Sequence, residues 1–273
     1  MTEPAIRFLT LDVTLDDDEY ERLEEIHATL KRLTRRRKDQ VSAFRPEPLQ
    51  QAEFDITIYL EALLHRVVAT TGGTIVSWNS GNVLCSFLAA RALFETVAVL
   101  HDYNQAIDKA LQSRSLNEIS SHSYKRTFAT RNKEVLSTRP ELEATNVLTF
   151  INKLSEEFGG STFRKAYDLM AERCHPNSAG TISMFAHIDP VTGVVTFSDR
   201  QNMEWAFRLI CAVTGVVTAA ELIFNKLDEA VVTVKALQRE LQDAEVQRKL
   251  RDLIKEASER QVIATRNIQG DEE

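Results

Sequence analysis

Apolar residues recur at helical spacing over most of this chain, and their pattern predicts its first element. They appear after three consecutive aspartates, which suit the positive end of a helix dipole. The first apolar set consists of Leu23, Ile26, Leu30 and Leu33. This spacing predicts a helix over residues 16–44, preceded by a short extended lead-in and ending before Pro46.

A second helix is predicted over residues 49–70 by a similar spacing of apolar side chains. Gly72 and Gly73 follow this stretch, and glycines at such a position commonly end a helix. Residues 75–82 are rich in capping and turn residues. We therefore expect a loop between the second and third helices.

The third predicted helix, over residues 82–113, is apolar on all sides between Asn82 and His101. A helix of this kind is buried on every face, so we expect it at the centre of the fold. Only Arg91 and Glu95 interrupt the apolar stretch, and their spacing of four places them on one face. Buried charges are costly unless they are paired and hydrogen-bonded, which makes this pair a candidate for function.

Polar sequence over residues 114–140 predicts a short helix and a connection. Two further helices are expected over residues 141–158 and 161–174, separated by the Gly159-Gly160 pair. The spacing then changes from helical to alternating, on both sides of a turn at residues 189–193. This predicts a β-hairpin at about residues 181–198. A lone hairpin is marginally stable in water, so we expect it to pack on the helices.

One long helix is predicted from residue 201 to beyond Leu237, and the chain becomes densely charged after Val234. The fold class is therefore mainly α: a multi-helix bundle with one β-hairpin insertion and a C-terminal helical arm. The predicted domains are a lead-in and basic amphipathic helix (1–45), a helical core (46–232), the arm (233–266) and a disordered tail (267–273).

The net charge of -7 argues against a generally basic surface for nucleic acids. A local cluster of cations nevertheless lies on the first helix: Arg32, Arg35, Arg36 and Lys38. These residues could form a patch that binds an anion or nucleic acid. The alternative is the solvated end of an amphipathic helix, where cations favour the dipole.

Three isolated cysteines, Cys85, Cys174 and Cys211, form no C-x-x-C pair. We expect reduced thiols in a cytoplasmic protein without a cofactor or a metal site. The most apolar run, residues 209–220, is shorter than the roughly 20 residues that a membrane span needs. This predicts a buried core helix and no membrane partner.

The candidate site combines the Arg91–Glu95 pair with the end of the helix at residues 161–174. Pro176 disfavours helical backbone at His175, so this histidine should lie where the helix stops. Glu95 could accept a hydrogen bond from His175 and set its tautomer. The other residues that could line the same pocket are Tyr167, Glu172 and Asn177.

Two interpretations of this constellation remain open at the level of sequence. In the first, His175 is a general acid–base and Arg91 stabilises developing negative charge on a phosphate. In the second, the residues form a buried structural cluster that ties the His175 loop to the central helix. The neighbouring pair His101-Asp102 is expected at the surface. Motifs for P-loop, Rossmann, α/β-hydrolase and zincin chemistry are absent from the sequence.

Two elements carry a resemblance to known proteins. The sequence has R-x-x-x-E at Arg91–Glu95 and, from Tyr167 to Gly180, Y-x-x-M-A-E-x-x-H-P-N-x-x-G. These resemble a group of uncharacterised bacterial helical proteins with R-x-x-x-E and Y-x-x-L-[SC]-E-x-x-H-P-N-x-x-G followed by a hairpin. The resemblance covers about residues 80–210, and the chain departs from the pattern at Met170-Ala171.

More distantly, a helical domain with a functional arginine and histidine is similar to the HEPN superfamily of defence and toxin ribonucleases. HEPN nucleases carry R-x(4–6)-H, a spacing that does not occur around His175. The resemblance would therefore require Arg91 to supply the arginine from another helix.

These observations support two hypotheses. The first is a bacterial or phage-borne cytoplasmic accessory or defence component with a structural Arg/Glu/His cluster, which pairs with a second copy through its helices. The alternative is a HEPN-like, metal-independent ribonuclease or nucleotide-processing enzyme that uses Arg91, Glu95 and His175.

Overall fold

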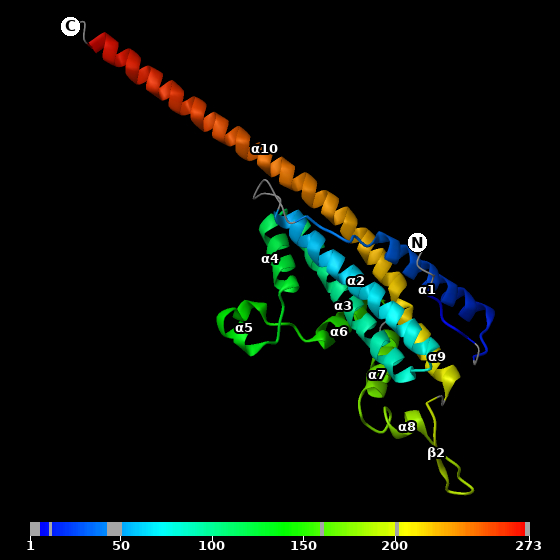
Figure 1. The fold of residues 1–273 in the computed structure, drawn as a ribbon. Helices are drawn as coiled ribbons and strands as arrows, with labels where there is room; N and C mark the ends of the chain where they lie inside the picture. The colour runs from blue at the N-terminus through cyan, green and yellow to red at the C-terminus, as the bar shows by residue number, and fades with distance from the viewer. Residues whose placement is uncertain (1–5, 11–12, 43–50, 159–160, 200–201, 271–273) are drawn as a thin grey trace.

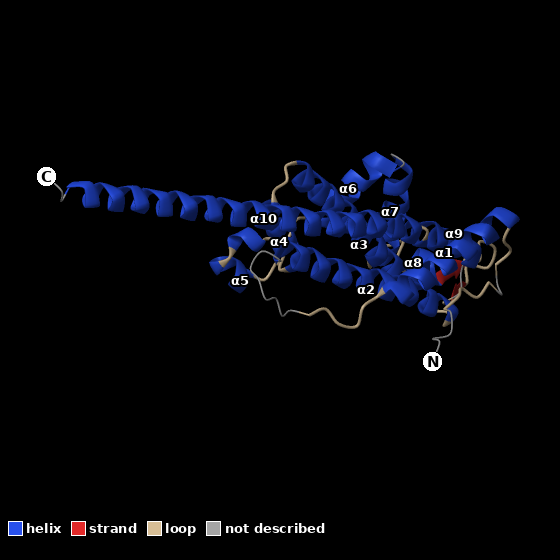
Figure 2. Cartoon of the chain, turned by 90° about the horizontal axis from the view of Figure 1, so that it is seen from above, coloured by secondary structure: helices blue, strands red, loops and turns tan. Residues whose placement is uncertain are grey.

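Helix α3 (Val83–Gln112) runs through the centre of the bundle and is covered by helices from both halves of the chain (Figures 1 and 2). A computed structural model describes residues 6–10, 13–42, 51–158, 161–199 and 202–270. The neighbours of α3 are α2 (Gln51–Asn79), α4 (Leu116–Thr127), α6 (Val147–Phe158), α7 (Ser161–Cys174), α9 (Met203–Thr214) and α10 (Val216–Gly270). The predicted central helix is confirmed, and so is the predicted fold class.

The remaining elements are short, apart from α1, which packs on α2 and α10. They are α1 (Asp17–Arg36), α5 (Lys133–Thr138), the 3-10 helix η2 (Pro140–Leu142), α8 (Ile182–Phe185), β1 (Ala186–Ile188) and β2 (Val195–Phe197). The helix predicted over 141–158 begins only at Val147. Before it, Thr130 exchanges backbone hydrogen bonds with Leu142 and Ala144, which holds that stretch out of a helix. The predicted break at Gly159-Gly160 lies outside the described residues.

Helix α1 begins as predicted and ends earlier than predicted. The Asp16 carboxylate accepts a hydrogen bond from the Glu19 backbone N–H, and the Glu19 side chain accepts one from Asp16. The helix stops at Arg36 because the following backbone binds α2 instead: the Lys38 N–H donates to Glu61. The predicted helix end, between Phe44 and Pro46, falls within residues 43–50, which the structure does not describe.

Helix α2 passes through Gly72 and Gly73, so the predicted helix end and the predicted loop at 75–82 are wrong up to Asn79. A Cβ at Gly73 would lie 3.7 Å from the Ala89 Cβ, which shows how closely α2 approaches α3 there. The packing between these helices outweighs the low helix propensity of glycine. Asn82 caps the start of α3, because its side chain accepts a hydrogen bond from the Cys85 N–H at 3.0 Å.

Residues 6–10 of the N-terminal lead-in are held between α1 and the end of α2. The Trp78 indole donates to the Leu9 carbonyl at 2.9 Å, and Asn79 bonds the backbone of Arg7 and Leu9. The Phe8 N–H donates to Nε2 of the buried His27 at 3.0 Å. This bond requires a neutral imidazole, and burial lowers the pKa of His27 below its usual 6.5.

We expect the free energy of unfolding to fall as the pH is lowered from 7.5 to 5.5. His27 and the buried His101 both have pKa values lowered by burial, so the unfolded chain binds more protons below about pH 6.5. Urea unfolding at the two pH values measures the difference, and His27→Gln should reduce it. Equal stability at pH 7.5 and 5.5 would contradict this interpretation.

The β-hairpin is present and shorter than predicted, because residues 182–185 form α8. Ala186, His187 and Ile188 pair with Phe197, Thr196 and Val195, respectively. The Asp189 carboxylate accepts a hydrogen bond from the Val191 N–H, and Gly193 adopts φ +70° in the turn. The hairpin projects from the bundle (Figure 1), and Phe197 is 72% exposed. The expectation that it packs on the helices is therefore wrong.

The predicted long C-terminal helix is two helices, with a break at Gly215 between α9 and α10. Helix α10 leaves the bundle after Gln238 and forms the arm, which extends far beyond the other helices (Figure 1). Along the described arm, Leu241, Val246, Leu250 and Leu253 are exposed. The predicted disordered tail is helical up to Gly270, and residues 271–273 lie outside the described chain.

Two helical stretches are long and apolar enough to cross a membrane: α3 and residues 203–253 of α9 and α10. The second stretch contains residues 209–220, the apolar run that we judged from the sequence to be too short for a membrane span. The helix around this run is longer, so length alone does not exclude a span. The bundle buries 56% and 50% of the respective apolar windows. A buried core helix passes the same test, and these helices are core helices here.

Candidate functional site

Arg91, Glu95 and Tyr167 meet at the contact between α3 and α7. The Glu95 Oε1 accepts a hydrogen bond from Arg91 Nε at 2.9 Å and another from the Tyr167 hydroxyl at 2.8 Å. The Arg91 guanidinium lies over the Tyr167 ring, 5.9 Å from its centroid. The structure therefore brings together three of the residues predicted for the site.

This cluster is largely enclosed by the packing of α7 on α3. Tyr167 is 2% exposed and its ring packs on Phe94, while the Arg91 and Glu95 side chains are 27% and 24% exposed. Burial raises the pKa of Tyr167, and its hydrogen bond to Glu95 raises it further. Burial likewise raises the pKa of the nearby Cys174 thiol. Both groups therefore stay protonated at neutral pH, and neither is an activated nucleophile.

His175 lies outside this cluster. It follows the last residue of α7, and its side chain is exposed. Within the described chain its imidazole has no hydrogen bond or ion pair. The hydrogen bond to Glu95 that we considered for His175 is made by Tyr167.

The His175–Gly180 stretch closes the end of α7 through its own contacts. The Asn177 amide donates to Glu172 at 2.5 Å, and its carbonyl oxygen accepts from the Gly180 N–H at 3.0 Å. The Arg173 guanidinium donates to the Ala179 carbonyl at 2.9 Å. Glu172 and Asn177 therefore hold this loop, and we find neither in contact with the Arg91 cluster among the described side chains.

Gly180 explains the spacing of this motif. A Cβ at this buried position would lie 1.9 Å from the His175 carbonyl oxygen and 2.7 Å from that of Arg173. No L side chain can be accommodated so close to backbone atoms without moving the loop. The His-Pro-Asn-x-x-Gly element thus has a sufficient structural explanation in the closure of α7.

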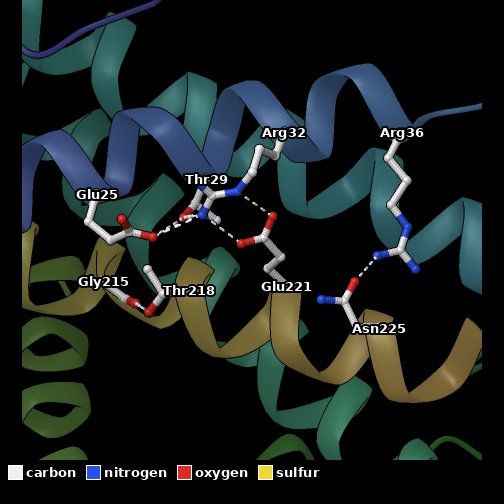
Figure 3. A network of polar contacts seen from close by, with 8 residues as sticks. All are labelled: Glu25, Thr29, Arg32, Arg36, Gly215, Thr218, Glu221 and Asn225. Atoms are coloured by element: carbon white, nitrogen blue, oxygen red, sulfur yellow. Dashed lines mark hydrogen bonds and ion pairs between the residues drawn. The ribbon is translucent and has the colours of Figure 1, made fainter.

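Two of the four cations proposed as an anion patch bind α10 instead (Figure 3). Arg32 makes two hydrogen bonds of 2.7 Å to the Glu221 carboxylate and one of 2.9 Å to Glu25. Arg36 donates to Asn225 and to the Phe224 carbonyl and is paired with Asp228. These residues join α1 to α10, so their charges are largely compensated within the chain.

The other two members of the proposed patch differ from each other. Lys38 pairs with Glu61 of α2 at 3.3 Å. Arg35 is exposed, and no ion pair or hydrogen bond of its side chain occurs within the described residues. One arginine alone does not make an extended phosphate-binding surface.

A polar cluster that we did not predict connects α3, α4 and α6. Asp102 is 5% exposed, pairs with Arg126, and accepts from Lys153 Nζ at 2.5 Å. Beside it, His101 Nε2 lies 2.8 Å from the Glu157 carboxylate. The expected surface position of His101-Asp102 is therefore wrong. The signal in the sequence was that His101 and Asp102 directly follow the apolar stretch of the central helix.

Metal binding and family membership receive no support. Among the described residues, no group of three or more His, Cys, Asp or Glu side chains is arranged to hold a metal ion. Comparisons with protein-family models, curated proteins and solved structures found no match for this chain. The chemistry must therefore be argued from the geometry alone.

Proposed function

We propose that this chain is a non-enzymatic helical accessory or defence component of a bacterium or phage, which acts in the cytoplasm. In this proposal the Arg91 cluster is structural and fastens α7 to the central helix. The observation that supports it best is that Oε1 of Glu95 accepts hydrogen bonds from both Arg91 and the buried Tyr167 hydroxyl. Through these bonds Glu95 joins a residue of its own helix to a residue of α7, which is the geometry of a structural contact.

The position of His175 also favours a structural cluster. A general acid–base must reach the reacting group, directly or through one water molecule. Here His175 shares no contact with Arg91 or Glu95, and the residues around it are occupied in closing α7. The bacterial or phage origin and the accessory or defence class rest on the sequence resemblance.

Pairing of two copies through helices belongs to the same proposal, with the exposed arm of α10 as the surface. An isolated helix in water is marginally stable, so a projecting helix with exposed leucines gains from a partner. Light scattering would then give twice the chain mass of 30.9 kDa.

The test of the structural interpretation compares wild type with His175→Ala and Arg91→Ala in RNA-cleavage and expression-toxicity assays. We expect no RNA cleavage by any of the three proteins, and toxicity that does not depend on His175. We also expect Arg91→Ala to lower the melting temperature, while His175→Ala, an exposed substitution, leaves it within about 1 °C.

The ribonuclease alternative makes the opposite prediction. RNA cleavage by the wild type that is lost in a normally folded His175→Ala variant would establish His175 as catalytic.

A further inference from the structure

Helix α1 runs parallel to α9 and the start of α10, in a constant register. Glu19 binds Arg208, Arg32 binds Glu221 and Arg36 binds Asn225, and each pair is 189 positions apart in the sequence. Figure 3 shows the second and third of these contacts. The same offset places Leu23 opposite Ala212 and Ile26 opposite Gly215, and all four residues line one pocket.

A slot of about 480 Å³ lies along this contact, where Glu19 and Arg208 are part of its lining. We call it the α1–α9 slot, and its apolar lining includes Leu15, Leu23, Ile26, Phe207, Cys211 and Ala212. It opens where large side chains of α1 face small ones beside the helix break at Gly215, so the two helices leave a gap. Its volume lies within the range of about 300–1,000 Å³ that is typical of ligand pockets.

The shape of the slot suits an elongated molecule. Its lining runs from Phe207 to Thr218 along α9 and the start of α10, which is about 16 Å at 1.5 Å per residue. Burial raises the pKa of Cys211 to about 12, so its thiol is an uncharged part of the wall. The Thr218 hydroxyl is occupied, because it donates to the Gly215 carbonyl at 2.8 Å (Figure 3).

One cation at the rim, Arg22, is placed to bind an acidic group of a ligand. The Glu19 carboxylate accepts a hydrogen bond from Arg208, which lowers its pKa. The Glu25 carboxylate accepts hydrogen bonds from Arg32 and Thr29, which lower its pKa as well. Arg22 uses its Nε to bind the Asp18 carbonyl, and within the described residues it has no carboxylate within 4.0 Å. Arg22 is exposed at the rim, so its remaining N–H groups are available to a carboxylate of a bound ligand.

We propose that the α1–α9 slot binds an amphipathic carboxylate, with its acyl chain between α1 and α9 and its acid group on Arg22. The ligand would bridge α1 and α9, so it would bind the folded chain and not the unfolded chain. Binding should therefore also raise the melting temperature. The proposal does not depend on whether the Arg91 cluster is structural.

The test is isothermal titration calorimetry of the full chain with decanoate, kept below its critical micelle concentration. Decanol, which has the same chain length and no charge, is titrated as the control ligand. We expect saturable 1:1 binding of decanoate that weakens about tenfold in Arg22→Gln and is unchanged in Arg35→Gln. Arg35 is the control because it is an exposed arginine of the same helix outside the slot. Decanol binding should be equal in all three proteins.

A second variant tests the location. Ala212 is an exposed residue of the slot, so Ala212→Trp fills it from the surface and should abolish binding of both molecules. Circular dichroism confirms that each variant is folded, and Ala212→Leu replaces the tryptophan variant if it is not. Absence of saturable binding, equal affinity of Arg22→Gln and wild type for decanoate, or full binding by Ala212→Trp would each overturn the proposal.

Discussion

The Asp102→Ala variant is expected to lose about 3 kcal/mol of unfolding free energy, the largest single effect of any polar substitution in the bundle. Asp102 is buried and forms ion pairs with Arg126 of α4 and Lys153 of α6. Its removal leaves Arg126 and Lys153 without the carboxylate that they share. We place the loss at the lower end of the range for broken buried pairs because the Lys153 side chain is 50% exposed.

Chemical denaturation measures this effect, and Asp168→Ala is the matched control. Asp168 also pairs with an arginine, Arg164, at 2.8 Å, but it is exposed. Exposed ion pairs contribute little, so this variant should lose less than about 1 kcal/mol. Equal losses in the two variants would show that the burial of Asp102 has no energetic consequence.

The Gly180→Ala variant is expected to lose about 2–3 kcal/mol, because the added methyl group would overlap the carbonyl oxygens of His175 and Arg173. Relief of this overlap requires movement of the loop that closes α7. We therefore expect α7 to loosen from α3, with faster amide hydrogen exchange along α7 as the local measurement.

Gly73→Ala is the control for Gly180→Ala, since both add one methyl group to a glycine. At Gly73 the new Cβ would be 3.7 Å from Ala89, an ordinary contact, and the position is inside α2. Alanine favours helix over glycine, so this variant should gain about 0.5–1 kcal/mol. A Gly180→Ala protein as stable as wild type would mean that the loop has no structural role.

The central helix and the candidate pair on it could be predicted because both are local properties. The continuous apolar stretch around Arg91 and Glu95 predicted a central helix, and spacing by four predicted their contact. Burial on every face was not fully borne out, because Leu88 is 45% exposed. The Asn82 cap and the hairpin turn at Asp189 were also predictable, since each is formed by hydrogen bonds between residues close in sequence.

The partner of Glu95 could not be predicted in the same way. Tyr167 and His175 lie eight positions apart on or beside the same helix, and both can donate a hydrogen bond to a carboxylate. The choice depends on which face of α7 packs on α3, and that packing buries Tyr167 and leaves His175 exposed. His101 and Asp102 were misplaced for the same reason, because α4 and α6 cover a polar position of α3.

By itself, the sequence determined the helical fold class, the central helix, the hairpin turn and the Arg91–Glu95 contact. Periodicity and short-range hydrogen bonds report on neighbours a few residues away. Only the tertiary structure decided that α2 continues through two glycines, that the cations of α1 bind α10, and that the α1–α9 slot exists. Each of these depends on surfaces far apart in the chain, and no pattern within one helix records which other helix will cover it.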